Sequence, residues 1–163
     1  MFVNMGPYDL VFRRIEHCED EGTKELDYHT KLNKVSKTEY AYNGECKIPD
    51  NTLLSVSATV YKKMQSGSWG KNYEHRIDNA CVELKKYFPE IFKMFTEEYL
   101  KVAAECPIPA DTYTAENWVV YVNEFPMEEL EYGEYKVESV LLRAEERIGC
   151  IQLFVDVEEK AAE

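Results

Sequence analysis

The residues of this chain whose chemistry is easiest to predict are its cysteines, Cys18, Cys46, Cys81, Cys106 and Cys150. They form no CxxC pair, and no histidine stands beside them in the spacing of a metal site. Such wide spacing favours disulfide bonds over zinc. The alternative is a set of reduced, buried thiols in a cytosolic protein. We therefore expect disulfides, an oxidising compartment, and no metal or other cofactor.

Motifs of known enzyme classes are missing from the sequence. There is no GxSxG elbow, HExxH pair, phosphate-binding glycine loop or dinucleotide fingerprint. His17, His29 and His75 could pair with Cys46 or an acid for nucleophilic catalysis, but their spacing selects no such set. We expect surface or strand-end histidines and a noncatalytic protein. A lipid-processing hydrolase that uses Cys46 or a histidine is a disfavoured alternative.

Composition limits the partners of this chain. It has 163 residues, with 31 acidic against 19 basic side chains and a formal net charge of -12. Such a charge repels a phosphate backbone, so we do not expect nucleic acid as a partner. The length and the 45% hydrophobic content suit a single domain over residues 1–163. No apolar run could span a membrane, and we expect that any secretory leader has been removed.

The acidic cluster of Glu19, Asp20, Glu21 and Glu25 is predicted to be a solvated surface loop. It lacks the alternating oxygen ligands and the glycine of a calcium-binding loop.

Period-two alternation of apolar side chains predicts a mostly β fold. The alternation is clearest at 54–60, at 133–142 and at 151–157. A charged turn at 143–147 separates the last two runs, so we expect them to be antiparallel neighbours. Further strands are expected at 8–18, within 27–42 and at 118–122, where Pro126 ends the pattern. The architecture is then about six to eight antiparallel strands in two sheets, as a sandwich or a barrel.

A short helical insert is predicted around residues 77–104, where the period changes from two to about 3.6. Asp78 is the expected cap of a first helix, and Pro89 the expected start of a second. The apolar face of the first helix is made up of Ile77, Cys81, Leu84 and Phe88. That of the second is made up of Ile91, Phe92, Phe95, Tyr99 and Val102.

Four stretches of the chain together match the pattern of one known family. They are GEYKVESVL at 133–141, RIGCI at 147–151, CP at 106–107 ahead of TY at 112–113, and IPDN at 48–51 running into LSV at 54–56. In these stretches the chain resembles the ML class of lipid-recognition domains, which includes the lysosomal ganglioside activator and arthropod chemosensory and lipid-carrier proteins. The resemblance covers most of the chain from about Pro49 onward. The extra disulfides of the activator have no counterparts here.

The resemblance implies an immunoglobulin-like sandwich whose sheets splay into a β-cup. It also implies two disulfides, Cys18 with Cys150 and Cys81 with Cys106, and leaves Cys46 unpaired. Alternation alone allows the inward side chains to fill a closed core, whereas the resemblance favours an apolar cavity that they line. The predicted lipid-binding residues are Leu54, Val56, Val60, Trp118, Val120, Val122, Tyr135, Val137, Leu141, Leu153 and Val155, with Phe88, Ile91, Phe92 and Phe95 covering one side.

Trp69 is the predicted membrane-contact residue. It lies in a predicted turn over 65–71, with Lys62, Lys63 and Lys71 nearby, and an aromatic ring among cations suits the headgroup region of a bilayer. The alternative is a tryptophan that packs back on its own hairpin.

The sequence thus predicts a secreted, extracellular or lysosomal lipid-binding or transfer protein. We expect it to hold an acyl or alkyl chain between its sheets, as an activator that presents a glycolipid to a hydrolase or as a carrier of apolar signals. Its expected partners are a fatty acyl lipid, a glycolipid or a hydrocarbon, together with a membrane surface, a receptor or a hydrolase. The alternative is an extracellular adaptor that binds a protein receptor, with the cavity filled or vestigial.

Overall fold

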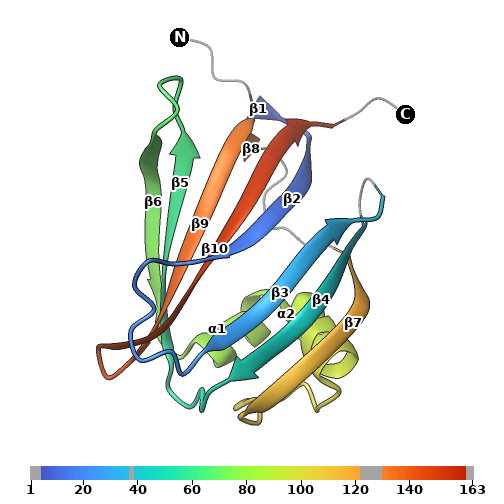
Figure 1. The fold of residues 1–163 in the computed structure, drawn as a ribbon, viewed down its shortest axis with the longest axis vertical. Helices are drawn as coiled ribbons and strands as arrows, with labels where there is room; N and C mark the ends of the chain where they lie inside the picture. Colours follow the sequence, from blue (N-terminus) through green and yellow to red (C-terminus); the bar gives the residue numbers. More distant parts are fainter. Residues whose placement is uncertain (1–4, 37–38, 122–129, 161–163) are drawn as a thin grey trace.

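A computed structural model of the chain describes residues 5–36, 39–121 and 130–160. The described part is mostly β, and its antiparallel strands form a sandwich with a short helical segment between two of them, as predicted (Figure 1). Of the predicted positions, Val122 and Pro126 lie outside the described residues, as does the side chain of Val120.

The larger of the two main layers, here called the large sheet, has the strand order β2-β10-β9-β5-β6. Both sequence runs near the C-terminus lie in it as antiparallel neighbours, joined by the tight turn at Ala144 and Glu145. Both turn residues have positive φ, which suits a two-residue hairpin. The strands are β2 (Tyr8–His17), β10 (Glu146–Glu159), β9 (Gly133–Arg143), β5 (Ser55–Lys63) and β6 (Trp69–Ile77).

The small sheet has the order β3-β4-β7, all antiparallel. Its strands are β3 (Asp27–Lys34), β4 (Glu39–Ile48) and β7 (Asp111–Tyr121). A separate two-residue ladder pairs β1 (Met5–Gly6) with β8 (Leu130–Glu131).

The two layers are joined along β2 and β3, which lie side by side, while β6 and β7 form the edges farthest from that junction (Figure 1). Tyr40 of β4 strengthens the junction. Its hydroxyl donates a 2.7 Å hydrogen bond to the carbonyl oxygen of Leu10, and its ring meets that of Phe12 edge-on at 5.1 Å. The faces that carry these contacts are the inner faces of the sandwich.

The helical insert consists of α1 (Ala80–Tyr87), α2 (Pro89–Lys93) and the π-helical segment η1 (Met94–Leu100). Pro89 begins the second helix, as predicted, because a proline at the first helical position loses no hydrogen bond. The prediction for the first helix was wrong in its details. Ile77 is the last residue of β6, and the helix starts only at Ala80. Of the predicted apolar face Cys81 is buried, whereas Leu84 has 44% of its surface exposed.

Asp78 does not cap this helix. The cap position is Asn79, in a left-handed conformation and without a side-chain cap hydrogen bond. The carboxylate of Asp78 instead accepts hydrogen bonds from the Ser55 hydroxyl at 3.1 Å and from Nε of Arg76 at 3.0 Å. The carboxylate of Asp78 therefore binds side chains of β5 and β6 and does not cap the helix.

Candidate functional site

The register of the large sheet places the predicted lining residues of its strands on one face. Antiparallel partners share a face, and Val60, Val137 and Leu153 are paired in one row across β5, β9 and β10. Two further rows repeat this face. They contain Val56 with Leu141, and Tyr135 with Val155. Leu54 precedes β5 and is buried, with 5% of its surface exposed.

The central row of this face is incompletely covered. Val60, Val137 and Leu153 are only half-buried, although each lies in a strand that is flanked by neighbours on both sides. At such positions a closed sandwich packs its side chains to near-crystalline density. Val155, on the same face near the end of β10, is in contrast buried, with 8% exposed. The centre of the inner face of the large sheet is therefore apolar and partly accessible.

The inner face of the small sheet carries aromatic and small residues that, apart from the predicted Trp118, sequence reasoning missed. The side chain of Tyr40 faces inward, and every second residue after it on β4 shares that face. These residues are Tyr42, Gly44, Cys46 and Ile48. The signal was present as a period-two run, YxYxGxCxI. On β3 and β7 the same face carries Tyr28, Thr30, Leu32, Tyr113, Ala115 and Trp118.

The helical segment packs onto this inner face at the β4 and β7 side. The Tyr99 ring lies 4.8 Å from the Trp118 ring and meets the Tyr42 ring edge-on at 5.2 Å. Phe95 stacks on Tyr99 at 5.5 Å, so two predicted lining residues, Phe95 and Trp118, are brought together by Tyr99. Phe92 is buried, while Phe88 and Ile91 are half-buried. The helices thus supply apolar surface beside the small sheet.

Cys46 lies on this face without a disulfide partner. Burial raises the pKa of its thiol to about 11, and the negative charge of Asp27 adds to the rise. A nucleophilic cysteine needs its thiolate, and here the protonated thiol is the form present at neutral pH. The geometry therefore gives Cys46 no activation for hydrolytic chemistry.

The structure forms both disulfides that the resemblance implied. Cys18, just after β2, is bonded to Cys150 of β10, with their Cα atoms 5.8 Å apart. Cys81 of α1 is bonded to Cys106 in the loop before β7, with a Cα separation of 6.0 Å. The first bridge ties β2 to β10, which are neighbours in the large sheet although they are its first and last strands along the chain. The second bridge holds the helical insert against the loop that leads into β7.

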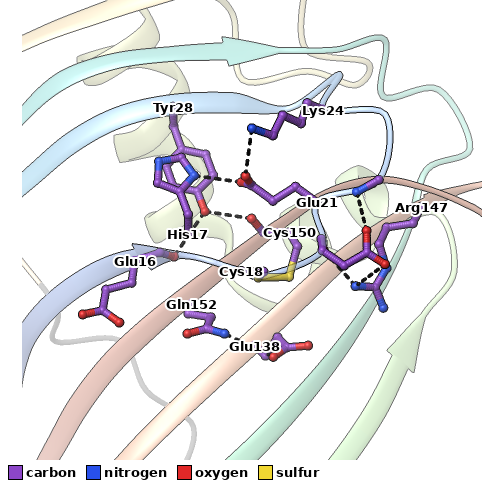
Figure 2. Close-up of a disulfide and its surroundings, with 12 residues drawn as sticks. Glu16, His17, Cys18, Glu21, Lys24, Tyr28, Glu138, Arg147, Cys150 and Gln152 are labelled. Carbon is purple, nitrogen blue, oxygen red and sulfur yellow. Dashed lines mark hydrogen bonds and ion pairs between the residues drawn. A yellow bond between two sulfur atoms is a disulfide. The ribbon is translucent and has the colours of Figure 1, made fainter.

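Figure 2 shows the side chains around the first bridge. The Tyr28 hydroxyl donates to the carbonyl oxygen of Cys150 at 2.7 Å, and the ring of His17 stacks on the Tyr28 ring at 4.3 Å. Nδ1 of His17 lies 2.8 Å from a carboxylate oxygen of Glu21. His17, at the end of β2, is thus a strand-end residue whose ring joins the two sheets.

Glu21 corrects the prediction for the acidic loop, because it is not a surface residue. Only 7% of it is exposed, whereas Glu19 and Asp20 beside it are exposed. The loop folds back over the bridge, where Thr23 donates its backbone N–H to the carbonyl oxygen of Arg147 at 3.2 Å. A buried carboxylate requires partners, and Glu21 has His17 and Lys24.

Trp69 lies at the start of β6, paired with Lys63, and not in the turn, which is shorter than predicted. It belongs to the outer face of the large sheet, where its ring meets the Phe154 ring at 5.8 Å. Lys136 lies 5.2 Å and Lys63 6.0 Å from the ring centre, and Arg14 covers Phe154 at 3.8 Å. Trp69 therefore forms part of a half-buried patch of aromatic rings and cations.

Within residues 5–36, 39–121 and 130–160, no group of three or more His, Cys, Asp or Glu side chains is placed to hold a metal ion. Nor is any helix of this described part long and apolar enough to cross a membrane.

The described part of the chain is a two-layer antiparallel β protein with two disulfide bonds and a partly accessible apolar row at the centre of its large sheet. No family model matches the sequence, and no similar sequence was found among curated proteins. Among solved structures, chicken MD-1 complexed with lipid IVa aligns over 98% of this chain and 100% of that chain, with 8% sequence identity and a TM-score of 0.39. A likeness this distant carries no functional argument, so a function has to be inferred from the chain's own geometry.

Proposed function

We propose that this chain is a noncatalytic lipid-binding protein that holds an acyl or alkyl chain between the inner faces of its sheets. One observation carries the proposal: Val60, Val137 and Leu153 keep part of their surface accessible at the centre of the large sheet. Apolar side chains in that position are stabilised by covering them, and a hydrocarbon chain is a suitable cover.

The hydrophobic effect supplies enough driving force for such a ligand. Each buried methylene contributes about 0.8 kcal/mol, so a chain of roughly fifteen methylenes has a ceiling near 12 kcal/mol before ordering costs are subtracted. The accessible row offers no charged group, since its three members are aliphatic. Recognition at this row therefore depends on shape and on hydrocarbon content.

A pair of neighbouring substitutions tests the proposal. Val60 faces inward, and the adjacent Thr59 faces outward with Glu138 and Glu74 as its strand partners. We expect Val60→Phe to fill the space beside Val137 and to weaken binding of a fluorescent octadecyl probe by at least about fivefold, because added volume strains a shaped apolar site. Thr59→Phe, the matched control, should bind like the wild type. Equal binding by all three proteins, or none by the wild type, would contradict the proposal.

The compartment and the biological role are finer parts of the proposal. Disulfides persist in oxidising compartments, which supports a secreted, extracellular or lysosomal protein. Two roles compete, namely presentation of a glycolipid to a hydrolase and transport of an apolar signal. Analysis of an organic extract of the purified native protein distinguishes them. Glycosphingolipid supports the activator role, and free fatty acid or hydrocarbon supports the carrier role.

Membrane contact through Trp69 is a further part of the proposal. The cations near its ring, Lys63 and Lys136, would attract anionic headgroups, which the chain as a whole repels. We expect Trp69→Ala to reduce association with liposomes that contain phosphatidylserine. The control is Tyr73→Ala, an exposed aromatic residue on the same strand. Full association of the Trp69 variant would remove this part of the proposal.

A further inference from the structure

A trough of small residues crosses the inner face of the small sheet. Thr30, Gly44 and Ala115 are paired in one row across β3, β4 and β7. The rows on either side carry large side chains, with Tyr42 and Trp118 in one and Tyr28 and Tyr113 in the other. Gly44 cannot be enlarged, because a Cβ there would lie 2.1 Å from the carbonyl oxygen of His29 and φ is +136°. The backbone around Gly44 therefore excludes a side chain at the middle of this row.

Two hydroxyl groups at this trough are buried and lack a well-formed hydrogen bond. They are Tyr99 Oη and Thr30 Oγ1, which make no hydrogen bond of good geometry within the described part of the chain, although the hydroxyl of Tyr42 interacts with both. Tyr99 as a whole is only 5% exposed, and its ring packs with Ala115 at one end of the row. Buried hydroxyls without a well-formed hydrogen bond are rare, since each costs about 1–3 kcal/mol of desolvation. Such a pair is expected where a bound molecule completes the hydrogen bonds.

The groups around the trough favour an uncharged ligand atom. Burial raises the pKa of Tyr42 and of Tyr99, so both phenols remain protonated donors at neutral pH. Of the lysines of β3 and β4, Lys31 and Lys47 alternate to the opposite face of the sheet, and Lys34 shares the inner face with Tyr40 but is exposed and lies two rows from Thr30. A carboxylate in the trough would thus be desolvated without a cation beside it, which is strongly unfavourable. A neutral oxygen needs only hydroxyl donors.

We propose that the trough binds an uncharged oxygen of the lipid, an alcohol hydroxyl or an ester or ketone carbonyl, through the hydroxyls of Tyr99 and Thr30. The inference rests on the proposed lipid-binding function and goes further, because it selects ligands by an oxygen atom held inside the protein. The hydrocarbon chain then covers the row of Val60, Val137 and Leu153 on the facing sheet.

A ligand series with equal chain length tests this site. Octadecane, octadecanol, methyl stearate and stearate are each titrated against the wild type, Tyr99→Phe and Thr30→Val by displacement of the fluorescent octadecyl probe. For the wild type we expect octadecanol and methyl stearate to bind about tenfold more tightly than octadecane or stearate. Tyr99→Phe should lose most of that preference, and Thr30→Val part of it, while both keep the wild-type affinity for octadecane. Tyr87→Phe, which removes an exposed hydroxyl on α1, is the control.

The folding of the variants is checked by thermal unfolding of the ligand-free proteins. Because Tyr99→Phe removes a buried hydroxyl that makes no well-formed hydrogen bond, we expect its midpoint to equal or exceed that of the wild type. Equal wild-type affinity for octadecane and octadecanol would show that the hydroxyls hold only a buried water, and would overturn the inference while leaving lipid binding intact. Tighter binding of stearate than of octadecanol would also overturn it. Failure of every ligand to bind would instead contradict the proposed function.

Discussion

The hydroxyl of Tyr28 donates a 2.7 Å hydrogen bond to the carbonyl oxygen of Cys150, so the small sheet is joined to the large sheet at the residue that carries the Cys18–Cys150 bridge (Figure 2). Tyr28 is 3% exposed and its hydroxyl also lies 3.2 Å from the carbonyl oxygen of Glu16. Together with the contacts of Tyr40, this hydrogen bond fixes the two sheets to each other along β2 and β3.

The hydroxyl of Tyr28 is expected to contribute measurably to stability. Tyr28→Phe keeps the ring that stacks on His17 but removes the donor, and we expect a loss of about 1 kcal/mol in the free energy of unfolding. Urea denaturation measures the loss. Tyr113→Phe, which removes an exposed hydrogen bond to Pro109, serves as the control and should change stability less. Equal effects of the two substitutions would contradict a special role for the junction.

The two disulfides should differ in their contribution to stability. The Cys18–Cys150 bridge spans 132 residues and the Cys81–Cys106 bridge 25, so restriction of the unfolded chain predicts about 5 kcal/mol for the first and about 3 kcal/mol for the second. We expect the Cys18→Ser, Cys150→Ser double variant to unfold at lower denaturant concentration than the Cys81→Ser, Cys106→Ser double variant. The reverse order under non-reducing conditions would contradict this reasoning.

Cys46 should resist alkylation in the folded protein. Since the pKa of its thiol is raised to about 11, little thiolate forms at pH 8, and we expect labelling by iodoacetamide to become fast only as the pH approaches that value. The same shift makes the protein less stable as pH rises from the ordinary thiol value toward 11, because the unfolded state then loses the proton more readily. Mass spectrometry under native conditions follows the labelling, with denatured protein as the control. Rapid labelling of the native protein at pH 8 would contradict the burial of this thiol.

Arg76 links the hairpins of the large sheet in a pH-dependent way. Its guanidinium donates to the carboxylates of Glu145 and Asp78, and these contacts lower the pKa of both carboxyl groups. The stabilisation is therefore present above their ordinary pKa values, near 4, and is lost as the pH falls through their lowered values. We expect Arg76→Ala to lower the unfolding midpoint at pH 7 and to have a smaller effect at pH 3. An effect that is as large at pH 3 would show that lost packing, and not charge, is responsible.

Much of the fold could be predicted because its strands follow simple alternation. β5, β9 and β10 lie where the period-two runs predicted them, and Pro89 begins a helix because its ring suits the first helical turn. Alternation failed in β2. There the register shifts between Phe154 and Val155 of β10, so Phe12 and Ile15, three positions apart, come to lie on the same face. A bulge of this kind depends on the partner strand and leaves no local pattern.

The candidate site was harder to predict for two physical reasons. The tyrosines of β4 are amphipathic, so Tyr40 and Tyr42 gave a weaker inward signal than the valines of β5 although their spacing was equally regular. The pairing of Thr30 with Gly44 and Ala115, and the approach of Tyr99 to that row, depend on tertiary contacts between distant segments. Tyr99 was predicted only as part of an apolar stripe, and nothing local shows that its hydroxyl lacks a well-formed hydrogen bond.

The central claim is that hydrocarbon lies between the inner faces, and the chain's two tryptophans test it directly. Trp118 is on the inner face of the small sheet, and Trp69 is on the outer face of the large sheet. Quenching of fluorescence by a bound octadecyl chain that carries bromine is measured in Trp69→Phe, which keeps only Trp118, and in Trp118→Phe, which keeps only Trp69. We predict strong, saturable quenching of Trp118 and little of Trp69. Equal quenching of both, or quenching of Trp69 alone, would contradict a ligand held between the sheets.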